Sequence, residues 1–126
     1  MVVVPAALRR ALEEHATAEA PNEACGLLAF RNGIAERYVA CINRLASPFR
    51  FELQPPEPGL VIDLEDEGYE LAVFHSHPTD SARPSRTDIA SIGLWEGRPY
   101  LILSRVTGEL AAWRIRGGAV EPLPLC

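Results

Sequence analysis

Short apolar segments separated by polar turns run along the 126-residue chain and predict both strands and helices. The predicted strands are Val2–Val4, Cys25–Phe30, Ile34–Cys41, Phe49–Leu53, Leu71–His77, Tyr100–Ser104, Glu109–Ile115 and Ala119–Leu123. Predicted helices run from Pro5 to about Glu19, from Pro56 to about Gly68, and onward from Ser85. The pattern therefore indicates an α/β (α+β) fold.

Composition predicts one domain over residues 1–126. The chain is 48% hydrophobic and 23% charged, which suits a globular protein with a buried core. It has no apolar run of about 18 residues and no secretory signal pattern, so we expect a cytoplasmic protein without membrane contact. Its formal net charge of −5 argues against nucleic acid as a partner.

The three cysteines form no disulfide framework that the sequence can define. Their number is odd and no C-x-x-C occurs. Cys25 and Cys41 flank Asn32-Gly33, a hairpin turn signal, so the two thiols should lie near each other across a ladder. A disulfide or redox control there is one hypothesis; buried, reduced cysteines are the default.

Two histidines separated by one residue carry the first candidate chemistry. On a strand, His75 and His77 point to one face, about 7 Å apart along the backbone, and can converge on one ion. The proline-rich segment 78–84 predicts a loop. Ser85 then suits a helix N-cap, with Asp88 in the first turn. An isolated Ser-x-x-Asp is typical of a cap, yet here Asp88 is also able to bind metal while Ser85 caps.

Two histidines and one carboxylate predict catalytic zinc, because zinc with three protein ligands keeps a fourth position for water. A nearby carboxylate must then move a proton from that water to the leaving amine. Glu23, just before the Cys25–Phe30 segment, is the candidate. Rival zinc motifs fit less well: there is no H-E-x-x-H, and Thr79 and Asp80 replace the last two residues of H-x-H-x-D-H.

The combined pattern resembles the JAMM (MPN-type) zinc metallopeptidases, in their small prokaryotic form. The resemblance runs from Val2 to Arg116 and is carried by Glu23 with Cys-Gly-Leu-Leu after it, His75-x-His77-Pro78, Pro84-Ser85, Asp88, and the segment from Asn43 to Pro48. It implies that both histidines and Asp88 bind one Zn²⁺, that Glu23 is the general acid/base, and that Ser85 stabilises the oxyanion. It also implies a curved, mainly antiparallel mixed sheet flanked by helices.

The resemblance further implies a substrate: a ubiquitin-like or sulfur-carrier protein, cleaved after its C-terminal Gly-Gly from a lysine, a cysteine or a short extension. Between Asp88 and Tyr100 there is no room for the second insertion of larger relatives, so we expect an open groove where a tail pairs with an exposed strand edge. Two alternatives stay open, a non-catalytic MPN-type interaction module and a zinc hydrolase of a small amino-acid amide. Whether a homodimer covers the strand is also open.

Overall fold

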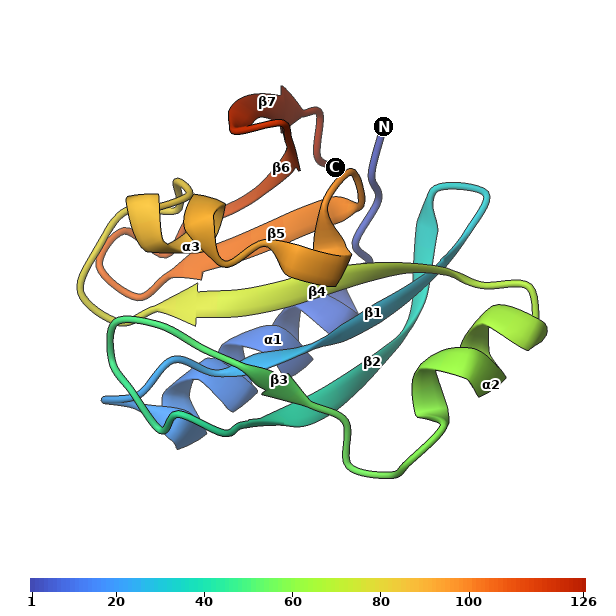
Figure 1. The fold of residues 1–126 in the computed structure, drawn as a ribbon, viewed down its shortest axis with the longest axis horizontal. Helices are drawn as coiled ribbons and strands as arrows, with labels where there is room; N and C mark the ends of the chain where they lie inside the picture. Colours follow the sequence, from blue (N-terminus) through green and yellow to red (C-terminus); the bar gives the residue numbers. More distant parts are fainter.

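A single seven-stranded sheet forms the centre of the molecule (Figure 1). The computed structural model describes residues 1–126. The strands are β1 (Cys25–Arg31), β2 (Ile34–Asn43), β3 (Leu53–Gln54), β4 (Glu70–His77), β5 (Pro99–Ser104), β6 (Leu110–Arg116) and β7 (Ala119–Leu123). Their order in the sheet is β3-β2-β1-β4-β5-β6-β7, and among these strands only β4 and β5 pair in parallel. The predicted mixed, mainly antiparallel sheet is confirmed.

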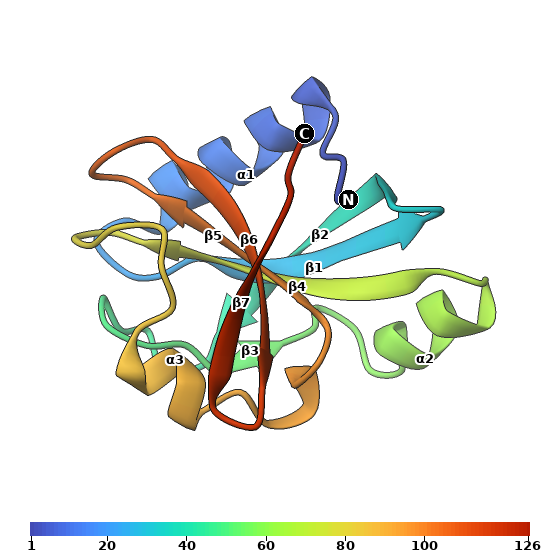
Figure 2. The same cartoon turned by 90° about the horizontal axis from the view of Figure 1, so that it is seen from above.

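Helices cover both faces of the sheet (Figure 2). On one face lies α1 (Ala6–Glu19), whose Leu12 is fully buried with Phe74 of β4 in the largest apolar cluster. On the other face lie α2 (Leu60–Asp66), α3 (Arg86–Ala90) and the 3-10 helix η1 (Gly93–Trp95). Successive side chains of β4 point to opposite faces of the sheet. Because both faces are covered, every position from Leu71 to His77 is buried. None of the helices is long and apolar enough to cross a membrane.

The two chain ends are hydrogen-bonded to each other. The Val2 N–H donates to Pro124 O and the Cys126 N–H donates to Val2 O, at 2.9 and 2.8 Å. Val3 in turn bridges to Ile34 at the start of β2. The predicted strand Val2–Val4 is therefore reduced to isolated bridges, which link the β7 end of the curled sheet to β2.

Two further predicted elements were wrong in extent. Residues 49–52 are not a strand, and β3 contains only Leu53 and Gln54, because the Asn43 side chain captures backbone groups of this segment. The second helix begins at Leu60 rather than Pro56: Gly59 has φ of +79°, outside the right-handed helical region. The other boundaries shift by one or two residues.

Candidate active site

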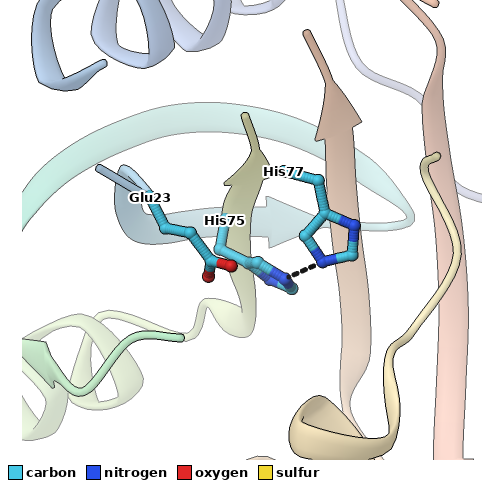
Figure 3. Close-up of side chains that lie close together, drawn as sticks. All are labelled: Glu23, His75 and His77. Atoms are coloured by element: carbon cyan, nitrogen blue, oxygen red, sulfur yellow. Dashed lines mark hydrogen bonds between the residues drawn. The ribbon is translucent and has the colours of Figure 1, made fainter. Parts of the chain in front are cut away.

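The ladder between β1 and β4 brings Glu23 to the two histidines. Cys25 is the antiparallel partner of His75. Two residues before Cys25 and two residues after His75, the same register reaches Glu23 and His77, and alternate side chains share one face. Figure 3 shows the Glu23 carboxylate directed toward the imidazoles. Residues far apart in sequence thus meet at one end of the sheet.

Three side-chain atoms form a compact triangle at this place. The Nε2 atoms of His75 and His77 are 3.0 Å apart, and Asp88 Oδ2 lies 3.3 Å and 3.0 Å from them respectively. All three residues are buried. Ligands bound tetrahedrally at 2.0–2.1 Å lie about 3.3 Å apart, so the triangle closely matches one face of a zinc site. The structure brings the three predicted ligands together.

The hydrogen bond behind His77 prepares its ring for metal binding. Its Nδ1 lies 2.7 Å from the Ser81 carbonyl oxygen, which can only accept, so Nδ1 carries a proton and Nε2 is the nitrogen that faces His75 and Asp88. The His75 ring is stacked on Phe51, with centroids 4.5 Å apart. Its buried Nδ1 has no hydrogen-bond partner.

Ser85 and Asp88 serve the helix and the site together. Ser85 Oγ accepts from the Asp88 N–H at 3.0 Å, and Asp88 Oδ2 accepts from the Ser85 N–H at 2.9 Å. This capping box starts α3 at the expected place. The same Oδ2 belongs to the triangle with the histidines. The cap is therefore confirmed, and it leaves Asp88 beside both histidines, so the metal-ligand interpretation is compatible with it.

Glu23 is a buried carboxylate that lacks a partner for one oxygen. Its exposed fraction is 2%, and Oε1 has no hydrogen-bond partner. Its carboxylate and the ring nitrogens of both histidines lie within 4.8 Å of one another, a group able to hold a metal. Burial, with a smaller contribution from the charge of Asp88, raises the pKa of Glu23 to about 8, although His77 opposes the shift. A carboxylate with this pKa can exchange protons near neutral pH.

The pKa values of His75, His77 and Asp88, the three predicted ligands, shift in different directions. Burial lowers the pKa of His75, which favours the neutral, metal-binding ring. Burial also acts to lower the pKa of His77, but hydrogen bonds to Asp88 and to Ser81 outweigh it and the pKa rises. Burial opposes ionisation of Asp88, yet hydrogen bonds from both histidines hold the pKa of Asp88 well below its usual range. The group thus combines a permanent carboxylate with two imidazoles, a donor set that zinc binds once the facing nitrogen of each ring is deprotonated.

Two cavities open on different sides of the triangle. The smaller, of about 60 Å³, contains Glu23, His77 and Ser85 and is walled by Pro48, Phe49, Pro78, Thr79 and Asp80. The larger, of about 390 Å³, is mainly apolar and runs past Asp88 between the loop before β3 and the segment from α3 to η1. The histidine strand β4 is central and paired on both sides, so it offers no free edge; the nearby edge strand is the two-residue β3.

Two residues that hold the loop beside the site, Ser104 and Trp113, could not be predicted from the sequence. Ser104 Oγ donates to Asp80 O at 2.7 Å, and Trp113 Nε1 donates to Ala82 O at 2.8 Å, which fixes the loop between the histidines and α3. A serine or tryptophan on a distant strand carries no local signal of such contacts.

The cysteines lie where the hairpin predicts. Cys25 and Cys41 are direct partners across β1 and β2, and both are buried. All three cysteines are free, so the disulfide considered between Cys25 and Cys41 is not formed. Burial raises the pKa of each of these two thiols to about 12, so they stay protonated near neutral pH.

Comparison with known proteins agrees with this geometry. The family model of prokaryotic homologues of the JAB domain (Prok-JAB) matches residues 5–116. The chain belongs to this family, and the resemblance to JAMM/MPN-type proteins found in the sequence is confirmed. The chain is 33% identical over 131 residues to a CysO-cysteine peptidase of Mycobacterium tuberculosis, covering 99% of this chain and 90% of that protein. It is also 38% identical over 105 residues to a probable TtuB-protein conjugate cleaving protease of Thermus thermophilus, covering 81% and 69%.

A third relative differs in length. The chain is 36% identical over 108 residues to the tail tip assembly protein K of Escherichia phage N15, covering 85% of this chain but 42% of that protein. Among solved structures, a protein from Desulfitobacterium hafniense superposes with a TM-score of 0.84 at 29% identity, covering 100% and 92%. A JAB1/MPN domain protein from Archaeoglobus fulgidus gives 0.58 at 16% identity, covering 100% and 96%, and shares the fold.

Proposed function

We propose that the chain, acting as one domain, is a zinc-dependent peptidase that hydrolyses the amide bond after the C-terminal Gly-Gly of a ubiquitin-like or sulfur-carrier protein. His75, His77 and Asp88 hold Zn²⁺, Glu23 is the general acid/base and Ser85 stabilises the oxyanion. The observation that supports this most directly is the triangle of three donor atoms beside a buried Glu23 carboxylate with one unpartnered oxygen.

The protein residues divide the chemistry among them. When bound, zinc supplies Lewis acidity toward the scissile carbonyl and lowers the pKa of water toward neutrality. Glu23 takes the proton from the attacking water and delivers it to the leaving amine. Ser85 Oγ accepts from the Asp88 N–H, so its own O–H is free to donate to the oxygen on which negative charge develops.

The relatives and the larger cavity support a protein tail as the acyl side. Two relatives are named for cleaving CysO-cysteine and TtuB-protein conjugates. The larger cavity is walled by Phe51, Leu53, Ile92 and Trp95 and reaches Asp88, so it accommodates an extended, partly apolar peptide. The cavity beside the triangle that contains Glu23, His77 and Ser85 has a volume of only about 60 Å³, which favours a residue without a bulky side chain next to the scissile bond. Glycine meets that requirement.

The smaller cavity favours a lysine side chain as the leaving group. Because Glu23 protonates the leaving amine, that amine must enter the cavity that contains Glu23. The rings of Pro48, Phe49 and Pro78 suit the methylenes of a lysine stem. A free amino acid would instead bring its α-carboxylate close to Asp80, and no lysine or arginine side chain lines this cavity.

Mass spectrometry of defined conjugates tests the function. Ubiquitin-like and sulfur-carrier proteins ending in Gly-Gly, joined to a lysine side chain, to free cysteine or to a short peptide, are incubated with the zinc-loaded protein. We expect release of the intact Gly-Gly terminus by wild type, loss of cleavage with chelator, and the fastest reaction for the lysine conjugate. Zinc binding without cleavage of any conjugate would instead indicate an interaction module, and cleavage of small amides alone would indicate the small-amide hydrolase.

A further inference from the structure

The amide side chain of Asn43 connects four backbone groups beside the active site. Asn43 is the last residue of β2. Its Nδ2 donates to the carbonyl oxygens of Glu23 and Arg50, each at 3.1 Å. Its Oδ1 accepts from the N–H groups of Leu45 and Glu52, also at 3.1 Å each. Both donors and both acceptor positions of the amide are therefore used, and no other side-chain type presents this set in the same geometry.

These bonds hold the main chain of Glu23 from both sides. The Asn43 amide binds the Glu23 carbonyl, while the Glu23 N–H donates to Ser47 O at 2.9 Å. Ser47 lies in the loop of residues 44–52, whose ends are joined by the Arg44 N–H donating to Glu52 O at 3.0 Å. Glu23 precedes β1 and lies outside its ladder, so its own N–H and carbonyl are held by the loop and by Asn43 rather than by β4.

The same loop forms a wall of both cavities. Pro48 and Phe49 line the small cavity with Glu23, and Phe49 is 71% exposed at its rim. Phe51 lines the larger cavity and stacks on His75. A change in the shape of this loop therefore reaches the acid/base residue, a predicted ligand and the substrate surface together.

We infer that Asn43 is a positioning residue that fixes the Glu23 backbone and the 44–52 loop for catalysis. The expected effect on kcat rests on the proposed function. The expected effect on the order of the Glu23 backbone and the 44–52 loop rests on the hydrogen bonds alone. Displacing a catalytic group by about 1 Å costs roughly 10²-fold in rate. Loss of the amide should thus lower kcat by about 10- to 100-fold, with a smaller effect on KM and no loss of zinc.

The test replaces Asn43 by aspartate. Aspartate keeps the acceptor Oδ1, but a second carboxylate oxygen takes the place of Nδ2 and faces the carbonyl oxygens of Glu23 and Arg50. Asn32→Asp, in the exposed turn between β1 and β2, makes the same chemical change away from the site. Zinc content, kcat and KM on a Gly-Gly conjugate, and amide hydrogen exchange by NMR are measured on zinc-loaded proteins. Exchange of the Glu23 N–H should quicken in Asn43→Asp, whereas that of Leu28 in the centre of β1 should not. Asn32→Asp should match wild type.

The exchange measurement separates this inference from the proposed function. A wild type that cleaves no conjugate contradicts the function, but faster Glu23 exchange in Asn43→Asp still supports the positioning role. Unchanged exchange together with unchanged kcat overturns that role. Lower thermal stability with unchanged kcat also overturns it. If Asn43→Asp does not fold, Asn43→Ser takes its place with the same expectations, and failure of both to fold makes Asn43 a structural residue and contradicts the inference.

Discussion

Ala24 and Ser76 are joined by two hydrogen bonds at the end of the β1–β4 ladder. The Ala24 N–H donates to Ser76 Oγ at 2.8 Å, and the Ser76 N–H donates to Ala24 O at 3.0 Å. Ser76 is the middle residue of His-Ser-His, and Ala24 follows Glu23 directly. This pair therefore carries the register that holds Glu23 against His75 and His77.

Glu23→Gln should retain zinc and lose activity. The amide keeps the size of the side chain but cannot take a proton, so we expect kcat to fall by about 10²- to 10⁴-fold with one Zn²⁺ per chain. Initial rates and elemental analysis measure the two quantities. Glu57→Gln, on an exposed loop, is the matched control and should match wild type. Near-normal rates in Glu23→Gln would remove Glu23 from the mechanism.

His77→Ala and Asp88→Asn should each lose zinc together with activity. Two remaining ligands bind the ion far more weakly than three, and His77→Ala also removes the bond to Ser81. Zinc content after dialysis and the rate on a Gly-Gly conjugate are the measurements. His15→Ala is the control, because His15 bonds Tyr38 on the α1 face of the sheet. Stoichiometric, tightly held zinc in Asp88→Asn would assign the third ligand elsewhere.

Ser85→Ala should affect both rate and stability. Loss of the oxyanion donor should lower kcat by about 10²-fold or more. Loss of the N-cap should lower the free energy of unfolding by about 1 kcal/mol. Ser85→Thr keeps a hydroxyl in the capping box and should preserve most of both quantities. Denaturant unfolding and steady-state kinetics compare the variants; a Ser85→Ala protein that is only less stable would leave Ser85 as a cap alone.

The metal-free protein should lose stability as pH rises, through Glu23. Its pKa is raised from 4.5 to about 8 on folding, mainly by burial. A raised folded-state pKa gives stabilisation that is present below pH 4.5 and lost as pH rises to about 8. Glu23→Gln removes this loss, so without zinc it should melt several degrees above wild type at pH 8.5 and nearly level with it at pH 4.5. Equal melting temperatures at both pH values would contradict the buried, uncharged state of Glu23.

Local patterns predicted most of the elements because strands and helix caps depend on neighbouring residues. The period of two in His75 and His77 and the Ser85 cap with Asp88 were sufficient to predict that these side chains form one cluster. Residues 49–52 were mispredicted because Asn43, which lies outside the segment, captures Arg50 and Glu52 backbone groups that a strand would use in its ladder. When a side chain takes the hydrogen bonds that a neighbouring strand would otherwise make, the alternation of apolar and polar residues does not reveal it.

The sequence by itself determined the chemical identity of the site: two imidazoles on one face of a strand, a carboxylate in the first turn of a helix, and a resemblance that assigned the roles. Only the tertiary structure decided that Glu23 reaches those groups, because the antiparallel register of β1 on β4 is set by packing on both faces of the sheet. It also decided the Asn43 network and the two cavities. These depend on contacts between segments distant in sequence, which no local pattern of residues encodes.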